Sequence, residues 1–176
     1  FQGVKFPMRI EQQTAGSMTL ALDISEVTPN AQINAAVPEH VAKAVERVTA
    51  EKVADGVWFL AGGSHNSVAI EMADHVVLVE APLGDERVSA VFQEVRKLVP
   101  NKPVRYVVNS HSHFDHSGGL RTAVAHGAAI VVQAQSKPYF EKAFANPSRI
   151  APDMLTKSGK KAKIVPVGEQ MVMKDA

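Results

Sequence analysis

The chain has 176 residues and no cysteine, which excludes a disulfide framework, a thiolate metal site and a cysteine nucleophile. Its formal net charge of +1 gives no electrostatic reason to expect nucleic acid or a membrane as a partner. The sequence also lacks any apolar run approaching the roughly 18–20 residues that span a bilayer. What is present, 45% hydrophobic and 21% charged residues, is typical of a globular domain with one sizeable core and an appendage.

These absences leave the cellular compartment open. No signal peptide is visible, but residues 1–3, Phe1-Gln2-Gly3, resemble the remnant of a cleavable purification tag, so an export signal would precede them. We prefer a bacterial periplasmic location over a cytoplasmic one.

The most informative stretch places three imidazoles and one carboxylate within six residues. It follows the apolar run Val104–Val108, which predicts a buried strand, and it precedes a Ser-Gly-Gly turn. His111 and His113 are expected on the same side of an extended segment, because side-chain direction repeats every two residues. Asp115 and His116 fall in the turn, so their side chains can point in a different direction from those of His111 and His113. Ligands gather at such carboxyl ends of strands in α/β sheets.

This residue pattern suits metal ions. Two imidazoles on one side can share a cation at about 2.0–2.1 Å, and neutral imidazole favours borderline ions such as zinc. The carboxylate and the third imidazole can hold a second ion, and ions about 3.5–4 Å apart share a hydroxide and activate it for attack. The alternative is a solvated polar loop without a ligand, which the density of the cluster between a strand and a glycine turn disfavours.

The run from His111 to Gly119, His-Ser-His-Phe-Asp-His-Ser-Gly-Gly, resembles the H-x-H-x-D-H signature of the metallo-β-lactamase-fold hydrolases. The resemblance implies that His111 and His113 bind a first metal ion, and that Asp115 and His116 bind a second. It implies two zinc ions per complete site, with Mn or Fe as other possible metals. It also implies an α/β fold of the αββα sandwich type, in which Asp115 orients the nucleophile or handles its proton.

Three further positions become candidates through this resemblance. The family usually has an Asp where Glu80 ends a predicted strand, so Glu80 is expected to orient the metal-binding loop from behind the ligands. A plain surface carboxylate is the alternative. Loops equivalent to residues 61–66 often overhang the metal site, so His65 and Asn66 are candidate substrate contacts; a polar turn without a role is the competing interpretation.

The rest of the chain gives the expected organisation. Residues 4–48 predict a β-rich arm or the end of an upstream region, with a helix from Pro38 to about Thr49 linking it onward. Residues 49–176 predict the first half of the family domain. That half should contain two hairpins, a helix over Val88–Val99, and a final hairpin that ends in Met171–Met173.

The family's remaining ligands, a third His, a bridging Asp and a last His, have no counterpart after His126. Each ion would then have two protein ligands, below the three of a catalytic zinc site. We therefore expect an inactive fragment of a longer hydrolase. Half a sandwich also leaves one sheet face uncovered. The expected partners are a small-molecule substrate and either a second copy or the missing C-terminal half, with no nucleic acid and no membrane.

Two functions from different classes follow. The first is a metal-dependent hydrolase in which activated water attacks an ester, thioester, lactone or amide. The second is a non-catalytic domain that keeps the fold for partner binding or assembly. A redox relative is disfavoured, since the di-iron members usually carry Glu where His113 stands.

Overall fold

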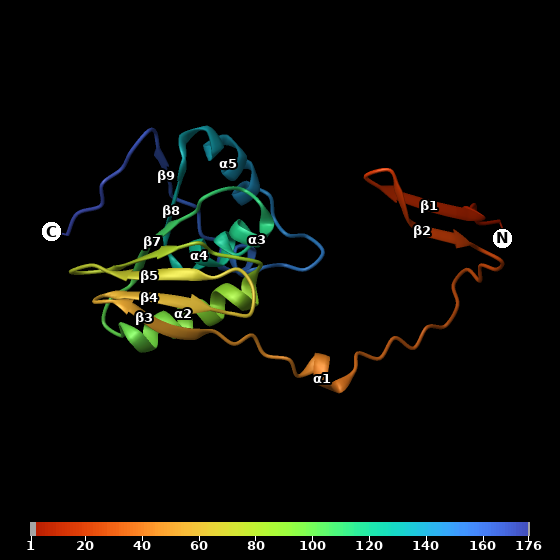
Figure 1. The fold of residues 1–176 in the computed structure, drawn as a ribbon, viewed down its shortest axis with the longest axis horizontal. Helices are drawn as coiled ribbons and strands as arrows, with labels where there is room; N and C mark the ends of the chain where they lie inside the picture. Colours follow the sequence, from red (N-terminus) through yellow and green to blue (C-terminus); the bar gives the residue numbers. More distant parts are fainter. Residues whose placement is uncertain (1–2, 176) are drawn as a thin grey trace. The chain divides into compact units, whose positions relative to one another are not determined.

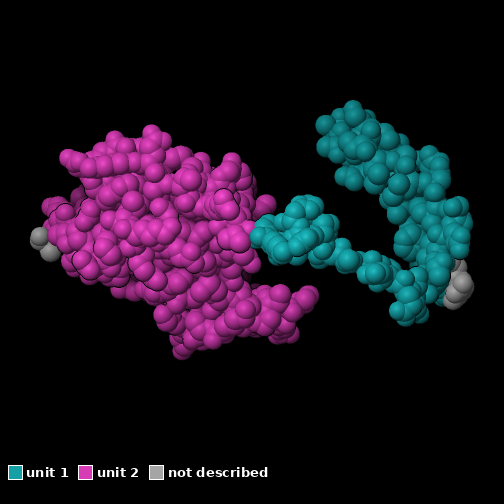
Figure 2. Space-filling view, turned by 90° about the horizontal axis from the view of Figure 1, so that it is seen from below, with its two compact units in different colours: residues 1–44 teal, residues 45–176 magenta. Residues whose placement is uncertain are grey.

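The computed structural model describes residues 3–175 and divides the chain into two compact units, residues 1–44 and 45–176 (Figure 1, Figure 2). The first unit holds a hairpin of β1 (Arg9–Thr14) and β2 (Ser17–Asp23). Its turn residues Ala15 and Gly16 have φ values of 49° and 80°, the left-handed conformation that tight hairpin turns require. Of the predicted tag remnant 1–3, residues 1 and 2 lie outside the described residues.

The predicted linking helix is much shorter than expected. Helix α1 spans only Glu39–Ala42, and the chain then runs without regular structure to the first strand of the second unit at Thr49. Val41 and Val45 of its apolar stripe are 52% and 77% exposed. A helix this short is marginal without a packed apolar face, which explains why the apolar spacing did not extend it.

The second unit is built on a seven-stranded sheet in the order β3-β4-β5-β6-β7-β8-β9. β3 to β6 pair antiparallel, whereas β6 to β9 are parallel. This mixed sheet with its helices confirms the predicted α/β fold class. The strands are β3 (Thr49–Ala54), β4 (Val57–Ala61), β5 (Ser67–Glu71), β6 (Val76–Val79), β7 (Val104–Val108), β8 (Ala129–Gln133) and β9 (Ile164–Val167).

Helices connect the parallel strands and cover the sheet. The longest, α2, follows β6 and carries the apolar stripe that the sequence predicted. The helical segments are α2 (Asp85–Leu98), α3 (Phe114–Ser117), α4 (Leu120–His126), the 3-10 turn η1 (Ala134–Ser136), α5 (Lys137–Ala145) and α6 (Met154–Ser158). Among the described residues, no helix is long and apolar enough to cross a membrane.

The main core lies between the sheet and the helices α2 and α4, and it takes every second residue of the inner strands. Val76 and Leu78 of β6 are fully buried in it, together with Val88 of α2. The intervening residues point to the opposite face. Several of them are apolar and only half-buried, including Val68 and Val108.

The predicted final hairpin is wrong. Residues Met171–Met173 form no strand, and β9 instead pairs in parallel with β8, with Val165 opposite Val131. A turn after β9 would have to return the chain antiparallel along the sheet edge. β9 is the edge strand and has room for such a partner, but the chain after it runs to the β5–β6 turn, where the Asp175 carboxylate accepts from the Ala73 N–H at 2.6 Å. Periodicity in the sequence does not encode that distant contact.

Candidate metal centre

The His/Asp cluster lies in the segment of residues 109–117, here called the His loop, directly after β7. β7 runs parallel between β6 and β8, so the loop leaves the sheet at the carboxyl ends of three strands. Asn109 anchors it there: its backbone N–H donates to the Val131 carbonyl at 3.0 Å, and its Nδ2 donates to the His116 carbonyl at 3.2 Å. The loop then closes into the single turn α3.

Two glycines let the end of the His loop approach its neighbours closely. A Cβ on Gly118 would lie 2.1 Å from the Leu83 carbonyl oxygen, and one on Gly119 would lie 2.1 Å from Cγ2 of Val88. The Gly119 N–H donates to the carbonyl of Ala81 at 2.9 Å. Close backbone packing, rather than an unusual φ, is therefore the reason for glycine at both positions.

The Glu80 carboxylate joins both ends of the His loop. Its Oε1 accepts from the Ser110 backbone N–H at 2.7 Å, and its Oε2 lies 2.9 Å from Nδ1 of His116. Glu80 itself has a φ of 68°, which is strained for a residue with a side chain. The structure therefore places Glu80 behind His116. With Nδ1 engaged by a carboxylate, the other ring nitrogen of His116 is left with its lone pair.

The three imidazoles of the loop converge. The ring centroid of His111 lies 4.8 Å from that of His113 and 4.2 Å from that of His116. His111 and His113 are exposed, whereas Asp115 and His116 are half-buried. The rings of His111 and His113 thus lie next to each other, and the expectation that they share an ion stays a prediction.

A fourth histidine, His65 from the β4–β5 loop, comes closer to the carboxylate than any histidine of the His loop does. His65 Nε2 lies 3.0 Å from Asp115 Oδ2, while His116 Nε2 lies 3.9 Å from the same oxygen. Among the described residues, His65, Asp115 and His116 are the group whose donor atoms all lie within 4.8 Å of one another. Asn66, the other candidate of that loop, is exposed, and its Oδ1 accepts from the Gly62 N–H within the loop at 3.4 Å.

Comparison with protein families identifies the family to which the chain belongs. The family model of the metallo-beta-lactamase superfamily matches residues 60–163, which include the inner strands, the β4–β5 loop and the whole His loop. The chain belongs to the metallo-beta-lactamase superfamily. This superfamily consists largely of metal-binding hydrolases, and it also contains proteins that are not enzymes.

Solved structures agree at the level of fold. The chain is similar to the metallo-beta-lactamase FIM-1 from Pseudomonas aeruginosa in a mono-zinc form, with 22% identity, a TM-score of 0.50, and coverage of 70% of this chain and 52% of that one. A metallo-beta-lactamase from Hirschia baltica matches with 22% identity and a TM-score of 0.48, covering 56% and 49% of the two chains. The chain thus spans about half the length of these structures. No curated protein sequence matches it.

The donors of this superfamily member fit a divalent cation. Imidazole nitrogen and carboxylate oxygen are ligands that zinc takes readily. Two atoms beside the cluster, His65 Nδ1 and Asn109 Oδ1, are buried without a hydrogen-bond partner in the part of the chain that the structure describes. Buried polar atoms without partners are uncommon and occur at functional sites. The sequence analysis named His65 only as a candidate substrate contact, because nothing in the local sequence indicates its approach to Asp115.

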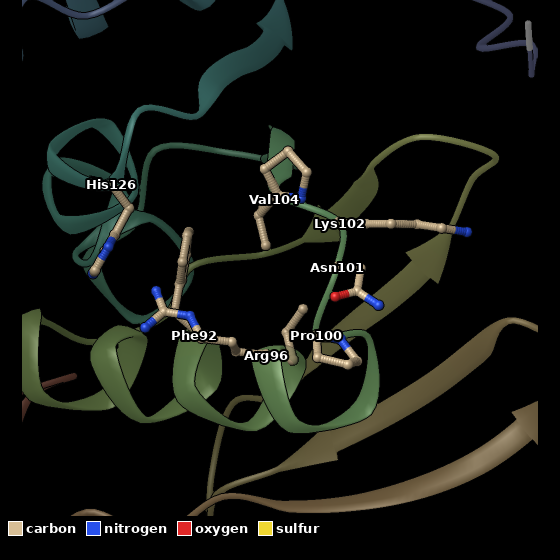
Figure 3. Close-up of a pocket in the computed structure, with 9 residues that line it drawn as sticks. Phe92, Arg96, Pro100, Asn101, Lys102, Val104 and His126 are labelled. Atoms are coloured by element: carbon tan, nitrogen blue, oxygen red, sulfur yellow. The ribbon is translucent and has the colours of Figure 1, made fainter.

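A cavity lies elsewhere in the superfamily fold. A cavity of about 330 Å³ opens beside Val104, at the opposite end of β7 from the His loop (Figure 3). Phe92 stacks on His126 at this cavity, with ring centroids 4.6 Å apart. Its residues contribute nothing to the metal donors, so this cavity is separate from the candidate metal centre.

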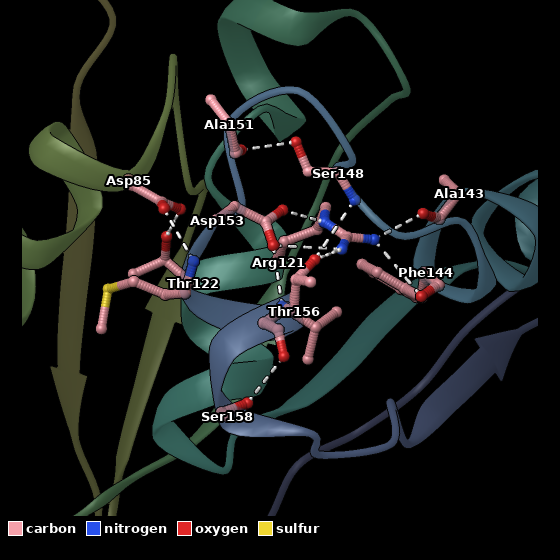
Figure 4. Close-up of polar contacts among 12 residues, drawn as sticks. Asp85, Arg121, Thr122, Ala143, Phe144, Ser148, Ala151, Asp153, Thr156 and Ser158 are labelled. Carbon is pink, nitrogen blue, oxygen red and sulfur yellow. Dashed lines mark hydrogen bonds and ion pairs between the residues drawn. The ribbon is translucent and has the colours of Figure 1, made fainter.

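Helix α4, which follows the His loop, is fastened by Arg121 (Figure 4). The guanidinium pairs with the carboxylate of Asp153 and donates to the Ala143 carbonyl at 2.7 Å and to Oγ1 of Thr156 at 3.1 Å. Asp153 also caps α6 by accepting from the Thr156 N–H at 2.8 Å. One side chain therefore connects the helix behind the loop to both α5 and α6.

Proposed function

We propose that this chain carries the metal-binding half of a metal-dependent hydrolase. The observation that carries the proposal is the convergence of His111, His113, Asp115 and His116 at the carboxyl end of β7, with Glu80 directly behind His116. Membership of a hydrolase superfamily supports the reaction class. The substrate would be a small molecule with an ester, thioester, lactone or amide bond.

A bound divalent ion, zinc in the first instance, would supply a water of lowered pKa and polarise the scissile carbonyl. His111 and His113 would hold one such ion, and Asp115 and His116 another. Glu80 keeps the proton of His116 on Nδ1 and so presents Nε2 to the site. The half-buried Asp115 carboxylate can accept a proton from the attacking water once that water is held nearby.

A complete site in the superfamily needs ligands beyond these, so we propose that hydrolysis requires the remainder of the parent polypeptide. The test compares residues 1–176 with the full product of the parent gene, using nitrocefin, a thioester and a lactone in the presence of zinc. We expect hydrolysis of at least one substrate by the full product and none by residues 1–176. Asp115→Asn should abolish it, and His40→Ala, an exposed histidine on α1, should not.

Zinc binding by the full product without hydrolysis of any probe would favour the second function, a non-catalytic domain for partner binding. The half-buried apolar side chains on the sheet face opposite the core, such as Val68 and Val108, favour that alternative. If Asp115→Asn turned over substrate at the wild-type rate, the hydrolase proposal would be wrong.

A further inference from the structure

The β4–β5 loop holds His65 in a fixed place. Arg87 at the start of α2 donates through Nη1 to the Ser64 carbonyl at 2.6 Å and to the His65 carbonyl at 3.2 Å, and through Nη2 to the Gly62 carbonyl. Its Nε pairs with Glu46 at 3.0 Å. The Arg87 side chain is only 6% exposed, so the loop is built around a buried guanidinium rather than left to solvent.

The conformation of the loop depends on this guanidinium. A Cβ on Gly62 would lie 2.4 Å from Arg87 Nη1, so glycine is needed where the loop wraps around it. His65 has a φ of 49°, which costs free energy for a residue with a side chain. A turn that only joins two strands does not need a strained histidine bonded to a buried arginine, because both cost free energy of folding. This conformation of the loop directs the His65 imidazole toward the His loop.

The His65 ring is directed at the donors of the His loop. It meets the His116 ring edge-on, with centroids 5.4 Å apart and an interplanar angle of 87°. Apart from Asp115 at 3.0 Å, neither ring nitrogen has a hydrogen-bond partner among residues 3–175, and Nδ1 is buried. The ring nitrogens of His65 are therefore not committed to holding the fold together.

We propose that His65, Asp115 and His116 form a three-donor site for a divalent cation of the zinc class, complete within this chain. The inference rests on the proposed metal dependence, but it changes the ligand set: the H-x-H-x-D-H signature gives each ion two donors here, and His65 supplies a third. Two neutral imidazoles and one carboxylate are a combination that catalytic zinc sites use, and they leave a fourth position open for water. The chain thus binds one ion with its own residues.

The test is zinc titration of residues 1–176 by calorimetry, with cobalt(II) absorption as a second readout. We expect the wild-type chain to bind a single ion, and His65→Ala to weaken binding by about 10-fold or more. His65→Gln separates a ligand from a positioning residue. Its amide can donate a hydrogen bond to Asp115 but is a poor zinc ligand, so it should bind as weakly as alanine and lose the same cobalt absorption.

His40→Ala, an exposed histidine outside the second unit, is the matched control and should bind like the wild type. Unchanged binding by His65→Ala, or recovery in His65→Gln, would overturn the role of His65 as a ligand. If His116→Ala and His111→Ala lost the ion while His65→Ala kept it, the proposed metal-dependent function would stand and only this inference would fall. A wild-type chain that binds no zinc at millimolar concentration would overturn this inference, whereas the proposed function is decided separately by zinc binding and hydrolysis in the full product.

Discussion

At the scale of single residues, the position of one proton on His116 decides which of its ring nitrogens can bind a metal ion. Glu80 Oε2 lies 2.9 Å from Nδ1, so the carboxylate keeps the proton on that nitrogen and leaves Nε2 able to bind a metal. In Glu80→Gln, the amide can still accept from Ser110, but then its NH₂ faces Nδ1 and favours the other tautomer. The proton would move to the nitrogen that should bind the ion.

We therefore predict that Glu80→Gln lowers the zinc affinity of residues 1–176 by about 10–100-fold without loss of the fold. Calorimetric titration gives the affinity, and long-range ¹H–¹⁵N NMR correlations report the tautomer of His116. Glu86→Gln, an exposed position in the first turn of α2, is the control and should change neither. Wild-type affinity in Glu80→Gln would mean that Glu80 is a structural carboxylate only.

At the scale of elements, the stability of the helices behind the His loop should depend on pH through Asp153. The Arg121 guanidinium beside it, together with hydrogen bonds from Thr156, holds the pKa of the Asp153 carboxyl well below its usual value of about 3.9. A carboxyl with a depressed folded-state pKa stabilises the fold above its unfolded pKa. That contribution is lost as the pH falls below about 4 toward the folded pKa.

Asp153→Asn should accordingly lower the free energy of unfolding by about 1.5–3 kcal/mol at pH 7, because the hydrogen bonds lose their charge. The difference from the wild type should shrink between about pH 4 and pH 2. Urea denaturation at a series of pH values measures both. Asp55→Asn, fully exposed in the β3–β4 turn, serves as the control and should have no measurable effect. A pH-independent difference would show that shape, not charge, matters at position 153.

Several elements were predictable because their signals are local. Val104–Val108 forms β7, Asp55-Gly56 turns the β3–β4 hairpin, and the stripe from Val88 forms one face of α2. The approach of His65 to Asp115 was not predictable in this way. It depends on Arg87, which lies 22 residues further along the chain than His65 and takes its place only when α2 packs on the sheet. No local spacing encodes that contact.

At the scale of the whole molecule, the sheet face opposite the main core carries a row of apolar side chains. On that face Phe59 pairs with Val68, and the row continues through Val79, Val108 and Val131. All but Val131 are only half-buried. Completing the burial of an aliphatic or aromatic side chain is worth up to about 1.5–3 kcal/mol, so such a row favours a covering partner.

We predict that residues 1–176 self-associate through this face, or copurify with the remainder of the parent polypeptide. Size-exclusion chromatography with light scattering should show a mass that increases with concentration. Val68→Lys places a charge in the centre of the row and should yield monomers. Ile150→Lys, at a fully exposed loop residue, should leave association unchanged. A wild-type chain that stays monomeric at high concentration would show that the described surface is already sufficiently covered.

Diffraction can show whether the carboxyl end of β7 binds a metal ion. Crystals of residues 1–176 grown with zinc would be measured on both sides of the zinc absorption edge. We expect an anomalous difference peak within about 2.0–2.2 Å of a ring nitrogen of His116 and a carboxylate oxygen of Asp115. Crystals in which the His loop keeps its conformation, with no zinc peak there or zinc only on other surface histidines, would contradict the claim.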